Sequence, residues 1–316
     1  MDISRDRLRT QAVREARKVR KHVAVRRLPR VDHDPLIVFG VGCQRSGTTM
    51  LGEIIDRSMD TWVYHEHDRR AFRDYRLRTG DVDRLARWSG RPVAVFKSIV
   101  DAQWTDRFLE PHPGSKAIWI YRRYTDVARS AIVTWGDHQQ GVINGIRARS
   151  FAELGWRRER LSDHVIETID RVHRPDLTVE EGAALFWWMR NSILWDRDLA
   201  DENRMLVVRY EDLVSDPGGS CARVFDFLGV HFDERFVPDT TPTAIRDDPL
   251  PDVSDEIRTL CDAAQDRLDL AHADSVGRTP RADPVSARAD PEQGDPVNPW
   301  LGHWGRRPSC DRGWTR

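Results

Sequence analysis

The chain has 316 residues, a formal net charge of -1 at pH 7 and a pI near 6.8. This length is enough for one large α/β domain with extensions, and the near-neutral charge gives no signal for nucleic acid as a partner. No stretch approaches the roughly 20 apolar residues that cross a bilayer, and the N-terminus lacks the apolar core of a signal peptide, so we expect a cytoplasmic protein. The four cysteines show no paired spacing, which predicts neither a disulfide framework nor a metal site.

The N-terminal segment is strongly basic. Its first thirty residues carry eleven Arg or Lys against three acids. We expect a basic helical arm over residues 1–33. A solvated arm and a peripheral contact with an anionic membrane or an acidic partner both fit this composition.

A glycine-bounded turn follows the first apolar strand. Residues 36–41 are the kind of short β-branched run that forms a strand buried on both faces. Apolar residues then recur at helical spacing from Met50 to Ile55. The backbone N–H groups of Ser46, Gly47, Thr48 and Thr49 therefore lie at a helix N-terminus and point at any bound anion.

The spacing of this turn is that of a P-loop, with one departure. Thr48 stands where a P-loop NTPase has lysine, and the basic residue comes earlier, at Arg45. The loss of that lysine weakens the assignment of a kinase or NTPase and favours a general oxyanion site. A P-loop kinase or NTPase and a non-catalytic nucleotide-binding protein stay open as alternatives.

Strands and helices alternate along the next part of the chain. After residues 61–72 we expect a charged helix to about Arg78, a strand over 92–98 that carries Lys97, and a helix over 103–110. A strand over 116–121 precedes a helix capped by Thr125 or Asp126. This order predicts an α/β fold, a three-layer P-loop-type parallel sheet flanked by helices.

The last third of the chain changes in character. Residues 148–200 are helical and aromatic and predict a helical insertion, and a strand follows over 204–213. Residues 271–299 contain five prolines and neither aromatic residues nor leucine or isoleucine, a composition typical of a flexible linker. We therefore expect an arm (1–33), one catalytic domain (34–270), and a Pro-rich linker with a flexible C-terminal tail (271–316).

Three separated segments resemble one family. QRSGTTML (44–51), IWIYRRYTDVARSAI (118–132) and VVRYEDLVSDP with VFDFLGV (207–230) are similar to motifs of the PAPS-dependent sulfotransferases, in particular the bacterial and tyrosylprotein-type branch. These enzymes move a sulfuryl group from 3′-phosphoadenosine 5′-phosphosulfate (PAPS) to an acceptor and use no metal. The resemblance covers residues 35–232.

The resemblance implies two phosphate clamps. The first segment would hold the 5′-phosphosulfate through Arg45, Ser46, Gly47, Thr48 and Thr49. In the second segment, Arg122 and Ser130 would bind the 3′-phosphate, although Tyr124 replaces the family's usual proline. Arg209, Tyr210 and Glu211 of the third segment are interpreted as structural residues behind the site.

Catalysis needs cations at the developing charge and a base for the acceptor proton. Arg45 and Lys97 are the predicted cations. A histidine expected in the cytosolic branch is replaced by Ile99, so Glu66 is the predicted base, with His65 and His67 as rivals. The acceptor stays open among carbohydrate, lipid, small molecule and peptide tyrosine, and the sequence carries no signal for an oligomeric state.

Overall fold

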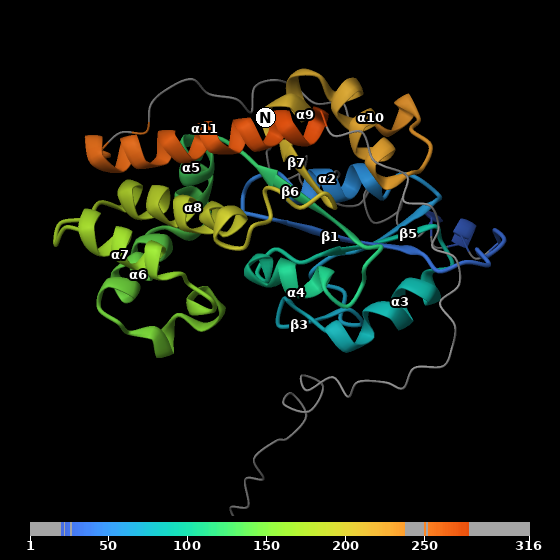
Figure 1. Cartoon of the computed structure of the whole chain (residues 1–316), viewed down its shortest axis with the longest axis horizontal. Helices are drawn as coiled ribbons and strands as arrows, with labels where there is room; N and C mark the ends of the chain where they lie inside the picture. Colours follow the sequence, from blue (N-terminus) through green and yellow to red (C-terminus); the bar gives the residue numbers. More distant parts are fainter. Residues whose placement is uncertain (1–19, 22, 26, 238–249, 251, 278–316) are drawn as a thin grey trace, which may run out of the picture. The chain divides into compact units, whose positions relative to one another are not determined.

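A five-stranded parallel sheet forms the centre of the protein in a computed structural model that describes residues 20–21, 23–25, 27–237, 250 and 252–277. The strand order is β2-β5-β1-β6-β7 (Figure 1). The chain moves from the central β1 to one side of the sheet and later crosses to the other, as the alternating pattern predicted. The strands are β1 (Leu36–Gly42), β2 (Thr61–Tyr64), β5 (Val93–Lys97), β6 (Lys116–Tyr121) and β7 (Met205–Arg209).

Both faces of the sheet are buried because helices pack on each of them, and successive side chains of a strand point into opposite cores. Val38, Val95 and Ile118 lie in one core, and Phe39 and Phe96 lie in the other. Figure 1 shows helices covering the two sides of the sheet. The first core is closed by α2 (Thr48–Ile55), α9 (Tyr210–Ser215) and α10 (Pro217–Leu228), and the second by α3 (Val82–Ser89), α4 (Thr105–Leu109) and α5 (Tyr124–Trp135).

The predicted helical insertion is present between β6 and β7. Its central helix α8 begins at a capping box in which Thr178 and Glu181 satisfy each other's backbone N–H groups. Trp187 donates from Nε1 to the carbonyl of Arg122 at 2.9 Å, which ties α8 to the carboxyl end of β6. The insertion comprises α6 (His138–Arg147), the 3₁₀ turns η3 (Phe151–Glu153) and η4 (Gly155–Arg158), α7 (Asp163–Val172) and α8 (Val179–Asp196).

A long helix that the sequence analysis missed, α11 (Asp255–Gly277), packs on β7 and α8. His272 and Ser275 form hydrogen bonds with the backbone of Val207 in β7, and Asp269 accepts a bond from Tyr121. The expected boundary at residue 270 therefore falls inside a helix. Residues 271–277, which were assigned to the linker, are helical because they cover the edge strand of the sheet. The rest of the linker and tail lies outside the described residues.

The prediction of a charged helix up to Arg78 is wrong. The chain forms a two-stranded hairpin instead, with Asp74 and Tyr75 at φ values of 51° and 65° in its turn. Positive φ at both central residues is the geometry that matches the twist of paired strands. The hairpin consists of β3 (Phe72–Arg73) and β4 (Arg76–Leu77), followed by η1 (Thr79–Asp81), and the other short turns are η2 (Ala102–Trp104) and η5 (Glu234–Phe236).

Helix α5 begins differently from the expectation. Its N-cap is Arg123, with no side-chain cap, rather than Thr125 or Asp126. Of the basic arm, residues 1–19, 22 and 26 lie outside the described part, while Lys21 is buried and binds Asp56 at 2.7 Å. Among the described helices none is both long and apolar enough to span a bilayer.

Candidate active site at the carboxyl ends of the strands

The turn after β1 is shaped for close backbone approach. Gly42 has φ 135°, and a Cβ there would lie 2.3 Å from the carbonyl oxygen of Ile120. Gly47 is the N-cap of α2 and offers no side-chain cap. The N–H groups of the first helical turn are therefore available to a ligand. The hydroxyl of Ser46 is buried and has no hydrogen-bond partner among the described residues. A buried polar group of this kind is typical of a ligand-binding site.

Lys97, Glu66 and Thr49 meet beside this turn. The Lys97 ammonium lies 2.8 Å from the Glu66 carboxylate and 2.9 Å from the Thr49 hydroxyl. These contacts form because β5 and β2 are parallel neighbours, so their carboxyl ends lie side by side. Burial by itself favours the neutral form of Glu66, but the charge and hydrogen bond of Lys97 outweigh it and lower the pKa of the carboxyl.

The two histidines that compete with Glu66 for the role of base have other neighbours. A Cβ on Gly52 of α2 would meet the His65 ring at 3.3 Å, so that ring packs on the helix. The exposed His67 forms an edge contact with Tyr75, with ring centroids 5.3 Å apart. Glu66, by contrast, accepts a hydrogen bond from the Lys97 ammonium.

Arg45 and Ser130 come together although 85 residues separate them. Arg45 adopts φ 69° in the turn, and its Nε donates to the Ser130 hydroxyl at 2.9 Å. Its guanidinium also lies over the ring of Trp135, 5.7 Å from the centroid. The two segments predicted to bind the two phosphates therefore adjoin at the carboxyl ends of β1 and β6.

Arg122 contacts both Asp126 and Tyr210. Its guanidinium lies 3.4 Å from the buried Asp126 carboxylate and stacks on the Tyr210 ring at 4.4 Å. The same ring contacts Gly47, where a Cβ would be 2.3 Å from Cδ2. Tyr210 thus joins the phosphate turn to Arg122, whereas the sequence analysis assigned it only packing behind the site. The signal in the sequence for a role in the site was the position of Tyr210 directly after the strand β7, at the carboxyl ends of the strands.

Glu211 supports the same region from behind. Its carboxylate is buried and accepts a bond from the Arg123 N–H at 3.0 Å. The Arg209 Nε atom lies 3.7 Å from the Glu211 carboxylate. Burial raises the pKa of Glu211. These contacts fit the structural role expected for Arg209 and Glu211.

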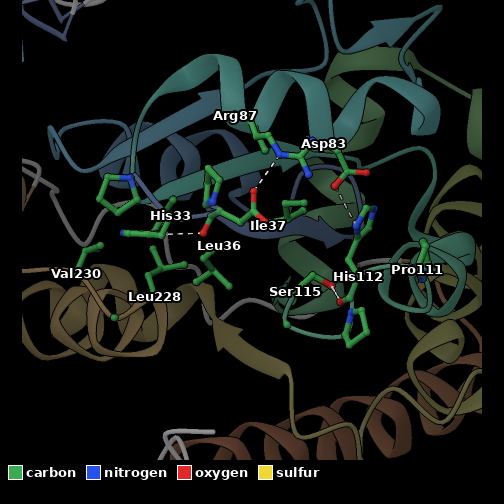
Figure 2. A pocket seen from close by; sticks show the side chains of 18 residues that line it. His33, Leu36, Ile37, Asp83, Arg87, Pro111, His112, Ser115, Leu228 and Val230 are labelled. Atoms are coloured by element: carbon green, nitrogen blue, oxygen red, sulfur yellow. Dashed lines mark hydrogen bonds and ion pairs between the residues drawn. The ribbon is translucent and has the colours of Figure 1, made fainter. Parts of the chain in front are cut away.

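A pocket of about 630 Å³ lies at the opposite end of the strands, where their amino ends are (Figure 2). Leu36, Val93 and Ser115 line it, at or just before the amino ends of three strands. Strands of five to seven residues separate this edge from the phosphate turn by roughly 13 to 20 Å. Ligands of open parallel sheets bind at the carboxyl ends, so we place the candidate active site at the phosphate turn and not at this pocket.

One comparison with known proteins identifies the family of this chain. A family model described as a sulfotransferase domain matches residues 35–247. A sulfotransferase from Alicyclobacillus acidocaldarius is 19% identical, with 78% of this chain and 100% of that chain covered and a TM-score of 0.47. The sulfotransferase domain from the curacin biosynthetic pathway is 16% identical (73% and 98% covered, TM-score 0.42), and that of the Synechococcus PCC 7002 olefin synthase is 17% identical (79% and 97%, 0.40). A search of curated proteins found no match.

Proposed function

The chain belongs to the sulfotransferase family, and we propose that it transfers a sulfuryl group from PAPS to the hydroxyl of a carbohydrate, lipid or small-molecule acceptor. The observation that carries this proposal is the 2.9 Å hydrogen bond between Arg45 and Ser130. It joins the turn assigned to the 5′-phosphosulfate with the segment assigned to the 3′-phosphate. A donor with an anionic group at each end of its ribose needs two cationic clamps about one nucleotide apart.

The donor-binding roles follow from the chemistry of each group. Arg45, Ser46, Thr48, Thr49 and the N–H groups at the start of α2 bind the 5′-phosphosulfate. Gly47 lets the backbone approach it. Arg122 binds the 3′-phosphate while Asp126 and Tyr210 fix the orientation of its guanidinium, and Ser130 contributes its hydroxyl.

The donor supplies the sulfuryl group, and the residues at the end of β5 and after β2 assist its transfer. The acceptor oxygen bonds to sulfur, the bond between sulfur and the bridging phosphate oxygen breaks, and the acceptor proton passes to Glu66. Lys97 and Arg45 stabilise the charge that develops on the oxygens around sulfur. Lys97 can act on the donor and on the base, because its ammonium bonds to Thr49 at the start of α2 and to Glu66.

Donor binding tests the assignment directly. We expect adenosine 3′,5′-bisphosphate (PAP) and PAPS to raise the melting temperature, since ligands that bind only the native state stabilise it by mass action. Mg-ATP serves as the comparison for a P-loop kinase or NTPase. Stabilisation by Mg-ATP that depends on magnesium, with none by PAP, would contradict the proposal. Release of PAP from PAPS in the presence of an acceptor then tests the transfer itself.

A further inference from the structure

Two arginines of the helical insertion meet on one tryptophan. The Arg157 guanidinium lies 4.6 Å from the centroid of the Trp156 ring, and that of Arg190 lies 4.9 Å from it. Arg190 of α8 is 2% exposed, whereas Arg157 of η4 is half-buried and reaches the surface.

This cluster is hydrogen-bonded to the segment that follows Lys97. Arg190 donates to the carbonyl of Ile99 at 3.0 Å and to the Gln103 side chain at 2.9 Å. Ile99 is two residues beyond Lys97 on the segment that leaves β5. Gln103 also donates to the carbonyl of Trp156 at 3.3 Å. The cluster is therefore anchored to the carboxyl end of the strand that carries the proposed catalytic lysine.

Two carboxylates of this region, Glu159 and Asp101, share one cation, Arg76. Glu159 forms a two-pronged pair with Arg76, with both distances 2.7 Å, and accepts from the Trp104 indole. Asp101 also pairs with Arg76 and accepts from the backbone of β4. Within the described part of the chain, neither Arg157 nor Arg190 has an ion-pair partner.

The two guanidinium groups therefore keep a net positive charge: Asp101 and Glu159 together exceed Arg76 by one negative charge, and the charge of Asp101 offsets part of the potential at Arg190. Burial lowers the pKa of Arg190 to about 10, so it stays charged at neutral pH. Burial also lowers the pKa of Arg157. Burial and then the charge of Arg157 lower the pKa of the nearby His138. A desolvated cation without a counter-ion is costly, and an anionic ligand removes that cost.

We propose that this cluster recognises the acceptor, and that the acceptor carries a carboxylate or phosphate which Arg157 binds beside Trp156, with Arg190 adding to the field. This inference rests on the proposed function, because it assigns the cluster to the acceptor side of the same site. Arg157 is the contact residue, since it reaches the surface. Arg190 is a positioning residue, since it orients Trp156 and the segment after Lys97.

Matched acceptor pairs test the proposal. The probes are 4-methylphenol against 4-hydroxyphenylacetate, and glucose against glucose 6-phosphate, each titrated into enzyme saturated with PAP. We expect an anionic member to bind roughly 10-fold or more tightly than its neutral partner, as a charge-assisted hydrogen bond allows. The two pairs distinguish a carboxylate from a phosphate. The preference should reappear in kcat/KM with labelled PAPS for any member that is turned over.

Substitutions at Arg157 and at its neighbour test which residue causes the preference for an anionic acceptor. Arg157→Gln should abolish it and Arg157→Lys should retain most of it, while Arg158→Gln, at the exposed neighbouring arginine, should leave it unchanged. PAP affinity should be the same in all three. Equal binding of both members, no binding of either anionic member, or a preference that survives Arg157→Gln would overturn the proposal. A wild-type enzyme that does not bind PAP would instead count against the proposed function.

Discussion

The ring of Tyr210 covers Gly47 so closely that a Cβ on residue 47 would lie 2.3 Å from its Cδ2 atom. The same ring also stacks on the Arg122 guanidinium, 4.4 Å from the ring centroid. One aromatic side chain therefore sets the separation between the turn that begins α2 and the cation that follows β6. Any change that moves the ring alters both proposed phosphate clamps together.

Gly47→Ala tests this coupling. The substitution combines a clash with Tyr210 and a φ of 93° that L-residues rarely adopt, which costs about 1–3 kcal/mol in strain alone. We expect PAP affinity to fall roughly 10-fold or more, measured by calorimetry. Gly141→Ala in α6 is the control, because a Cβ there meets no atom within 4 Å. Equal PAP affinity in the two variants would show that the turn does not contact the nucleotide.

Arg122→Ala should weaken donor binding more than it slows the chemical step. Loss of a charge-assisted bond to the 3′-phosphate reduces PAP affinity by roughly 10-fold or more, whereas kcat at saturating PAPS changes little. Arg107→Ala removes an exposed ion pair with Glu110 and provides the control. Wild-type PAP affinity in Arg122→Ala would refute the assignment of the 3′-phosphate.

Glu66→Gln should separate binding from chemistry. The amide keeps the shape of the side chain but cannot accept the acceptor proton, so kcat should fall by about 100-fold or more. PAP affinity should stay within experimental error of the wild type. His67→Gln is the matched control, because that exposed ring contacts Tyr75 instead. Undiminished turnover in Glu66→Gln would remove Glu66 from the mechanism.

The contact between Lys97 and Glu66 predicts a pH dependence. The pKa of Glu66 is lowered, so its basic form persists below the usual range for a glutamate and the acid limb of kcat/KM should lie there. In Lys97→Met the attractive charge is lost while burial remains, so the pKa rises and the limb moves to higher pH. An acid limb at the same pH in both enzymes would argue against Glu66 as the titrating base.

Helix α11 should contribute measurably to stability although it lies beyond the matched residues 35–247. His272 bonds to the carbonyl of Val207 at 2.8 Å and to Asp212 at 2.9 Å. His272→Ala should lower the free energy of unfolding by about 1–3 kcal/mol, measured by urea denaturation. Asp274→Ala, at an exposed position of the same helix, should change it by less than about 0.5 kcal/mol. A loss as large in Asp274→Ala would show that helix propensity, not the β7 contact, matters.

Patterns along the chain predicted the sheet but not every helix. The apolar runs that became β1, β5, β6 and β7 are continuous because both of their faces are buried. Helix α11 was missed because its buried residues are spread among many charged ones, and its last turn continues into a proline-rich segment. The β3–β4 hairpin was missed because Asp74-Tyr75 is not a usual sequence for a turn with two positive φ values.

The sequence does not show which of the predicted site residues contact one another. Glu66 and Lys97 were chosen separately, and their contact depends on the pairing of β2 with β5, which the sequence does not state. The cluster at Trp156 escaped notice for a different reason. Arginine is abundant in this chain, and a cation that lacks a counter-ion can be recognised only after every nearby carboxylate has been assigned to its partner.

The position of β1 between β5 and β6 divides the protein into a part that is fixed and a part that is free to vary. Backbone ladders on both sides hold the turn after β1 at one strand spacing, about 4.8 Å, from the strands that lead to Lys97 and Arg122. Side chains of the insertion have no such ladder. A descendant enzyme can therefore exchange the residues of η4 for others and acquire a new acceptor, while β1, β5 and β6 keep the geometry for the donor unchanged.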